Sequence, residues 1–173
     1  MTRLGLPVPF GMVITTQTCR EYFERGNKLP RGLEPEYRAA MKLVEGRMGA
    51  RFGDPENPLL VSVRSGAPVS MPGMMNTILN LGLNDAITAG LAAKTGNARF
   101  AYDSYRRFIQ MFADVVLGVD GEHYEDIIEA HKKRQGYTSD PEMTAEDWQN
   151  VIAEFKTIAP IPEDPYEQLR LAI

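Results

Sequence analysis

Residues 59–84 read LLVSVRSGAPVSMPGMMNTILNLGLN. The largely apolar start, residues 59–63, predicts a short strand that delivers Arg64 at its end. A loop rich in Gly, Ala, Ser and Pro follows, and a second apolar run covers residues 77–83. An arginine at a strand end, followed by small residues that let a ligand approach the backbone, is a frequent arrangement in phosphate sites. The stretch therefore predicts an anion site next to a small sheet.

Two roles are open for Arg64 on these residues alone. Its guanidinium stays charged at any relevant pH, and its planar donors match pairs of phosphate oxygens. The alternative is an ion pair with one of the chain's 23 Asp and Glu residues. Because Arg64 follows an apolar strand, its side chain is expected to emerge where the sheet ends, next to the loop.

The loop after Arg64 also has two interpretations. Pro72-Gly73 is a turn dipeptide, and Ser65, Ser70 and Thr77 add hydroxyl donors beside backbone N–H groups that can surround an anion. Neither the GxxxxGK[ST] nor the GxGxxG pattern occurs, so the loop is not a Walker or dinucleotide-binding loop. The methionines at 71, 74 and 75 would suit packing over an apolar surface such as a base. An ordinary connection with buried methionines is the alternative.

Outward from this stretch, the patterning predicts a small mixed lobe before it and helices after it. Met12–Thr16 is β-branched and predicts a strand, with helices expected over residues 17–25 and 33–48. The core face of the second helix carries Tyr37, Met41, Val44 and Met48. After Asn84, helices are expected over residues 85–94, 98–117 and 124–133, from residue 144, and over 166–173. The fold class is therefore α+β, with a mixed lobe followed by an all-helical subdomain.

Composition bounds the function. The chain has 173 residues, 43% hydrophobic and 24% charged, which is typical of one globular domain or two small lobes. A net charge of −4 disfavours non-specific nucleic-acid binding, and no apolar run is long enough for a membrane span. The single Cys19 fits a cytoplasmic protein, and with only two histidines a Cys/His zinc site is not expected.

Other charged groups receive structural interpretations. Arg106 and Arg107 lie on the polar side of the expected helix 98–117, as a solvated face or a docking surface. His123 and His131 have neither metal-ligand nor nucleophile spacing, and neither is expected to be catalytic. The basic cluster at residues 131–134 is explained by the dipole of the helix that it ends. No general acid–base pair can be singled out, so no catalytic residue is predicted.

Three motifs carry a family resemblance: VSVRSGAPVSMPGMMNTILNLGLN, the later KTGNARFAYDSYRRFIQMF and the earlier GLPVPFGMVITTQTC. Over nearly its whole length the chain resembles the N-terminal nucleotide-binding region of the pyruvate, phosphate dikinase family. The resemblance implies part of an ATP-grasp fold, in which a β-phosphoryl of ATP passes to a histidine on another domain. It also implies the overall conversion of ATP, phosphate and pyruvate to AMP, diphosphate and phosphoenolpyruvate, with Mg²⁺ and a monovalent cation.

The resemblance assigns nucleotide-binding residues. The family's ATP-contacting arginine matches Arg64, and its phosphate loop matches residues 71–77. The expected ATP-binding set is Arg64, Ser65, Gly73, Met74 and Thr77, with no metal ligand identifiable. Asn76 stands where the family usually has Asp, which puts any role of that carboxylate in metal binding or in fixing the loop in doubt.

The resemblance also implies missing partners. The family's ATP-binding lysine segment, second ATP-grasp lobe, phosphohistidine domain and pyruvate barrel have no counterpart among these residues. The expected organisation is a partial nucleotide-binding lobe at 1–83, a helical subdomain at 84–160 and a linker with the start of a helix at 161–173. Expected partners are ATP or phosphate and the remaining domains, and the chain alone is not expected to catalyse the reaction. The alternative is a truncated, non-catalytic nucleotide-binding or interaction module, with self-association to a homo-oligomer.

Overall fold

The structure is a computed structural model that describes residues 4–5, 8–66 and 76–173. The chain forms two compact units, residues 1–51 and residues 52–173, and each is described by itself. The expected division at residues 83/84 separates a nucleotide-binding lobe from a helical subdomain by function, whereas the two units are separated by their contacts. The functional division stays a prediction. The α+β class is confirmed, because the described residues combine helices with a small antiparallel sheet.

The first unit contains two helices, α1 (Thr16–Glu24) and α2 (Leu33–Met48). The expected strand at Met12–Thr16 is wrong: residues 8–15 form no described strand, and Thr15 precedes the first turn of α1 in an extended conformation. A β-branched run favours extended backbone, but a strand also needs a hydrogen-bonded neighbour. Helix α2 has the predicted bounds. Its core face is shorter than predicted, because Met48 is 52% exposed.

The sheet belongs to the second unit. Strands β1 (Val61–Arg64) and β2 (Thr77–Leu81) pair antiparallel, with Arg64 opposite Thr77. Strand β1 lies slightly later than the predicted 59–63, so Arg64 is the last residue of the strand rather than the residue after it. The change does not affect the expectation that Arg64 stands at a strand end.

Helices make up the rest of the second unit. They are α3 (Asp85–Thr95), α4 (Ala98–Phe112) with a π-helical continuation η2 (Ala113–Leu117), α5 (Glu122–Gln135), the short 3₁₀ helix η3 (Asp140–Glu142), α6 (Ala145–Ile158) and α7 (Pro165–Ala172). Polar caps start several of them: the Asn84 and Asn97 side chains accept hydrogen bonds from Ile87 N and Phe100 N at 2.8 and 3.0 Å. Such caps satisfy N–H groups that have no partner within the helix.

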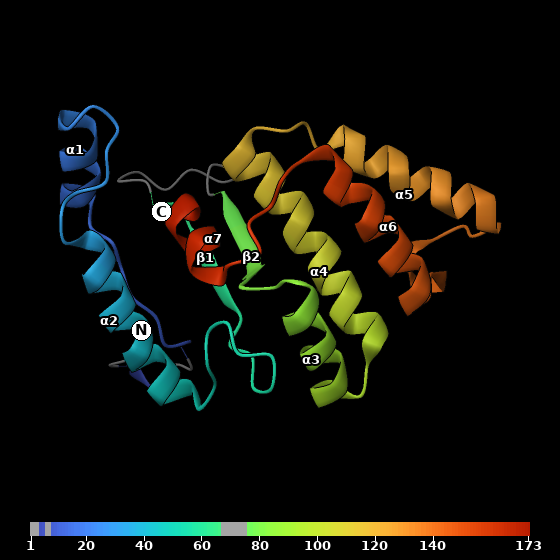
Figure 1. The fold of residues 1–173 in the computed structure, drawn as a ribbon, viewed down its shortest axis with the longest axis horizontal. Coiled ribbons are helices and arrows are strands. Elements are labelled where there is room, and N and C mark those ends of the chain that lie inside the picture. The colour runs from blue at the N-terminus through green and yellow to red at the C-terminus, as the bar shows by residue number, and fades with distance from the viewer. Residues whose placement is uncertain (1–3, 6–7, 67–75) are drawn as a thin grey trace. The chain divides into compact units, whose positions relative to one another are not determined.

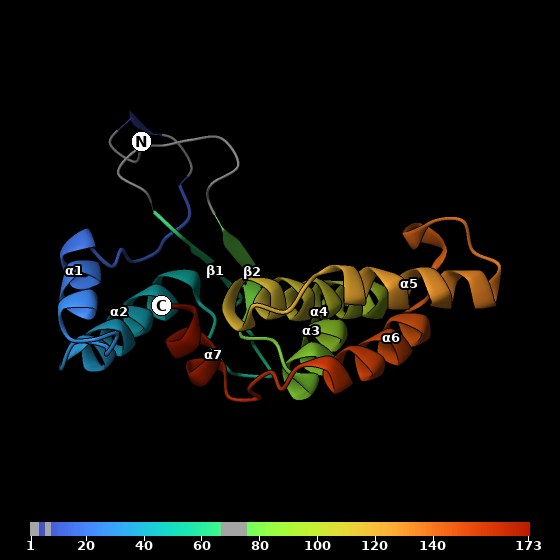
Figure 2. The same ribbon diagram turned by 90° about the horizontal axis from the view of Figure 1, so that it is seen from above.

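Helix α4 is the centre of this unit. It packs against α6, α3 and β2, and Figures 1 and 2 show α3 and α6 running alongside it. Its apolar face is fully buried at Ala101, Phe108 and Phe112. Trp148 and Phe155 of α6 are equally buried. Since β2 packs on the same helix, the sheet and the helices share one hydrophobic core. No helix within residues 4–5, 8–66 and 76–173 is long and apolar enough to cross a membrane.

Candidate functional site

The two-stranded sheet brings three of the predicted site residues together. Arg64 and Thr77 are opposite each other, and Ser65 follows directly. The Ser65 N–H donates to Asn76 O at 3.0 Å, which continues the ladder one step beyond the strands, and the Ser65 hydroxyl lies 3.4 Å from the same oxygen. Directly opposed residues point to the same face of a sheet. Arg64 and Thr77 therefore present a guanidinium and a hydroxyl side by side.

Arg64 is exposed, and its charge is not neutralised by the part of the chain that the structure describes. None of the ion pairs or side-chain hydrogen bonds found there involves its guanidinium. Arg107, by comparison, is also exposed and pairs with Asp103 at 3.2 Å. An arginine without a carboxylate partner keeps its donors available for an anionic ligand.

The remaining predicted residues, Gly73 and Met74, lie outside the described residues, as do Met71, Pro72 and Met75. Asn76 is described and exposed, and its backbone oxygen is the acceptor that closes the ladder. The assignment of Arg64, Ser65, Gly73, Met74 and Thr77 to a nucleotide site stays a prediction.

The inner end of the sheet is held by a buried glutamine of α7. The Gln168 side chain is fully buried, and its amide nitrogen donates to Leu83 O and Pro162 O, each at 2.8 Å. Its amide oxygen accepts from Gly82 N at 3.0 Å. One carboxamide thus satisfies two backbone groups of the turn that leaves β2 and one in the segment before α7. No sequence pattern predicted this role, because an isolated Gln in a short terminal helix matches no motif.

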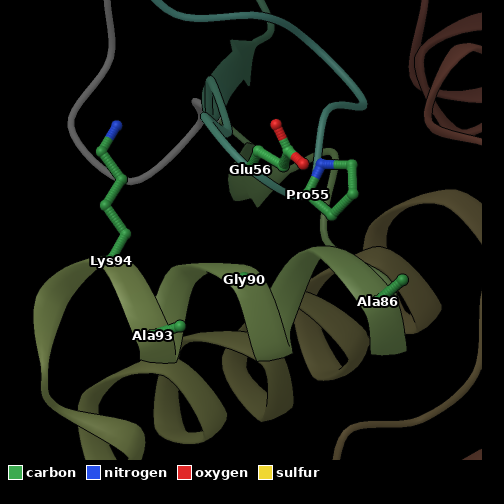
Figure 3. A pocket seen from close by; sticks show the side chains of 6 residues that line it. All are labelled: Pro55, Glu56, Ala86, Gly90, Ala93 and Lys94. Carbon is green, nitrogen blue, oxygen red and sulfur yellow. The ribbon is translucent and has the colours of Figure 1, made fainter.

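A shallow hollow lies over α3, and Arg64, Ser65 and Thr77 are not among the residues that line it. It has a volume of about 510 Å³ and is lined by Pro55, Glu56, Ala86, Gly90, Ala93 and Lys94. Figure 3 shows the small residues along one face of α3, with Pro55 and Glu56 opposite them and Lys94 at one end. Lys94 donates a hydrogen bond to the Asn57 side chain. Close packing explains the glycine at position 90, since a Cβ there would stand 1.7 Å from the Pro55 carbonyl oxygen.

A buried polar network joins the end of α5 to the start of α6. His131 Nε2 donates to Asp147 Oδ1 at 2.9 Å, and the Thr144 N–H and hydroxyl donate to Oδ2 at 2.8 and 2.7 Å. The Tyr137 hydroxyl donates to the same oxygen at 3.3 Å. Burial opposes ionisation of Asp147, but the hydrogen bonds from His131, Thr144 and Tyr137 outweigh it and hold the pKa of Asp147 at about 2.

This network has the form of a helix start rather than of a catalytic pair. Thr144 and Asp147 make a complete capping box. His131 lies in the basic cluster ascribed to the helix dipole, but it is buried and serves as a donor to Asp147. The pairing of His131 with residue 147 joins two helices, so no local pattern could reveal it.

The expected solvated face at Arg106 and Arg107 is wrong for Arg106, whose side chain is only 7% exposed. Arg106 pairs with Asp103 and Asp140, each at 3.0 Å, and its guanidinium lies 4.5 Å from the centre of the Trp148 ring. Helical spacing places this residue at the border of the apolar face. A delocalised cation can be buried there because carboxylates and an aromatic ring surround it. Arg107 is exposed, as expected.

Comparison with known proteins places the whole chain in one group of relatives. No family model matches it. It is 55% identical over 179 aligned positions to a pyruvate, phosphate dikinase of Giardia intestinalis, 51% to one of Entamoeba histolytica and 48% to one of Clostridium symbiosum. Each alignment covers all of this chain but only 20–21% of the relative. The chain spans about a fifth of the length of the curated relatives it matches.

Proposed function

We propose that the β1–β2 region of this chain contributes to the binding of the ATP phosphates in an enzyme of the pyruvate, phosphate dikinase type. The proposal starts from the homology of the whole chain to a segment of pyruvate, phosphate dikinases. In this proposal the segment belongs to an ATP-grasp nucleotide-binding fold. The observation that carries it is the exposed guanidinium of Arg64, at the last position of β1, next to the Thr77 hydroxyl and with no ion pair among the described residues.

Each predicted group has a part in the proposed site. The Arg64 guanidinium would bind phosphate oxygens in pairs, because its planar donors match their spacing. The hydroxyls of Ser65 and Thr77 would donate to the same anion, and the loop with Gly73 and Met74 would complete the cradle. Mg²⁺ would accompany the ATP phosphates, but no group of three or more His, Cys, Asp or Glu side chains able to hold a metal occurs among the described residues. The metal's ligands would come from other parts of the enzyme.

Replacement of Arg64 by alanine tests this proposal. The Arg64→Ala variant is expected to bind ATP and diphosphate about tenfold or more weakly, because a charge-assisted hydrogen-bonding group is worth about 1.5–3 kcal/mol. Isothermal titration calorimetry with each ligand measures the change. Arg107→Ala is the matched control, since it removes another exposed arginine, one that is already paired with Asp103. Equal affinity of wild type and Arg64→Ala would remove Arg64 from the site.

A second candidate, a protein-interaction role, is favoured by the surface of the first unit. Helix α1 buries none of its residues, and Val13, Phe23 and Leu43 are 87%, 66% and 71% exposed. Large exposed apolar side chains favour association. We expect the isolated chain to self-associate at micromolar concentration and the double variant Phe23→Ser/Leu43→Ser to be monomeric. Sedimentation velocity distinguishes the two, and a monomeric wild type at all concentrations would count against this role.

A further inference from the structure

Strand β2 contains one more residue than its partner requires. The register pairs Val61 with Leu81 and Val63 with Ile78. Between these pairs β1 has one residue, Ser62, and β2 has two, Leu79 and Asn80. This two-against-one arrangement is a β-bulge, which bends the strand and changes the direction in which later side chains point.

The bulge decides which side chains of β2 reach the core. Ile78 and Leu81 are 2% and 0% exposed, yet they are three positions apart. In a regular strand, residues three apart point to opposite faces. The extra residue lets both point inward, and Leu79 is left outside at 39% exposure. Without the bulge, one of these two apolar side chains would have to leave the core.

Asn80 is the residue whose backbone makes the bulge. Its φ is +58°, in the left-handed region that β-branched residues avoid and that asparagine tolerates. Its side-chain Nδ2 donates to the backbone oxygen of Ser104, 3.3 Å away in α4. The bulge is therefore both shaped by the conformation of Asn80 and fixed to the central helix of the unit.

We infer that Asn80 is a positioning residue for the phosphate-binding groups: its bulge sets the face of the sheet on which Arg64 and Thr77 point. Val63 and Ile78 face the core as one pair, so the next pair, Arg64 and Thr77, points to the opposite face. A shift of one residue would turn Thr77 to the core side and bring a different residue opposite Arg64. This inference deepens the proposed function and rests on it for the identity of the ligand.

The test compares two substitutions at the same position. Asn80→Gly keeps the left-handed conformation and loses only the hydrogen bond to Ser104, whereas Asn80→Val disfavours that conformation and favours a regular strand. Leu79→Val is the matched control, because it introduces the same residue at the exposed neighbouring position. Affinities for ATP are measured by calorimetry, thermal unfolding identifies any variant that does not fold, and the strand register is read from backbone NOEs between Arg64 and Thr77 and between Val63 and Ile78.

Asn80→Val is expected to lose both NOE pairs and to bind ATP about tenfold more weakly. Asn80→Gly and Leu79→Val are expected to keep the register and to bind within about threefold of wild type. The double variant Arg64→Ala/Asn80→Val is expected to bind ATP no more weakly than Arg64→Ala does. Both substitutions remove the same interaction, the contact of Arg64 with the phosphates, so their effects do not add. A general loss of structure would instead add to the Arg64 effect.

Two results would overturn the inference. Asn80→Val that keeps the register would show that the bulge does not depend on this residue. The second is an Asn80→Val variant that loses the register but binds ATP with wild-type affinity, while Arg64→Ala binds ATP more weakly. That result would show that the face of the sheet on which Arg64 and Thr77 point is irrelevant to ATP binding. If Arg64→Ala itself has no effect, the proposed function fails, and the NOE measurement alone decides whether Asn80 sets the register.

Discussion

Gly90→Ala is expected to destabilise the second unit by about 3 kcal/mol. The new Cβ would stand 1.7 Å from the Pro55 carbonyl oxygen and 2.7 Å from its carbonyl carbon. Both are backbone atoms, so no side-chain rotation relieves the overlap. Helix α3 would have to move away from residue 55, and α3 also packs on α4 in the core. Figure 3 shows how closely the Pro55 segment faces α3 at this point.

Chemical denaturation measures this effect. Trp148 is the single tryptophan, and it is fully buried in the second unit, so its fluorescence reports the unfolding of that unit. Gly46→Ala is the matched control: Gly46 lies within α2, is exposed and has no atom within 4 Å of a new Cβ. That variant, followed by far-UV circular dichroism, is expected to be neutral or stabilised by up to about 1 kcal/mol through helix propensity. An unchanged midpoint for Gly90→Ala would contradict the close packing of α3 against Pro55.

Asp147→Asn is expected to destabilise the second unit by about 2 kcal/mol at neutral pH. The carboxylate accepts hydrogen bonds from His131, Thr144 and Tyr137, and it is the acceptor half of the capping box of α6. A carboxamide has one acceptor oxygen instead of two. Its NH₂ group would also face a donor, either the His131 N–H or the Thr144 N–H. The buried network would then contain at least one unsatisfied donor.

The same substitution is expected to change the response to acid. Because the pKa of Asp147 in the folded protein, about 2, lies below the ordinary value of 3.8, its ionisation stabilises the fold above pH 4. That contribution is lost as the pH falls from about 4 to about 2. Denaturation midpoints across this window should fall less steeply for Asp147→Asn than for wild type. Asp126→Asn, an exposed change on α5, is the control and should leave the slope as it is. Parallel slopes for wild type and Asp147→Asn would show that Asp147 does not titrate there.

Local patterns predicted the helices well because each helix carries its own signals. The 3.6-residue spacing in α4 and the Thr144–Asp147 cap of α6 lie within a few residues of each other, so they could be read from the sequence. The strand expected at Met12–Thr16 failed because strand formation depends on a distant hydrogen-bonding neighbour. Arg106 was misassigned for a similar reason, since its partner Asp140 is 34 residues away.

The candidate site was predictable only in part. The placement of Arg64 at a strand end followed from the apolar run before it and the loop after it. The bulge at Asn80 did not, because residues 77–83 form a nearly continuous apolar run that indicates a strand but not its register. Register depends on which residues the partner strand and α4 bury. Gln168 likewise acts on backbone groups more than 80 positions earlier in the chain.

The contacts of Gln168 have a consequence for the order in which the chain folds. The N–H of Gly82 and the carbonyl of Leu83 obtain their partner from a residue synthesised 85 or more positions later. During translation these two backbone groups would therefore stay hydrogen-bonded to water until α7 has emerged. Helices α3, α4 and α6 precede α7 in the chain and can form before it. Contacts between residues far apart in the sequence form slowly, because closing the intervening loop costs conformational entropy. The end of β2 at Gly82 and Leu83 would thus be among the last parts of the second unit to acquire its final support.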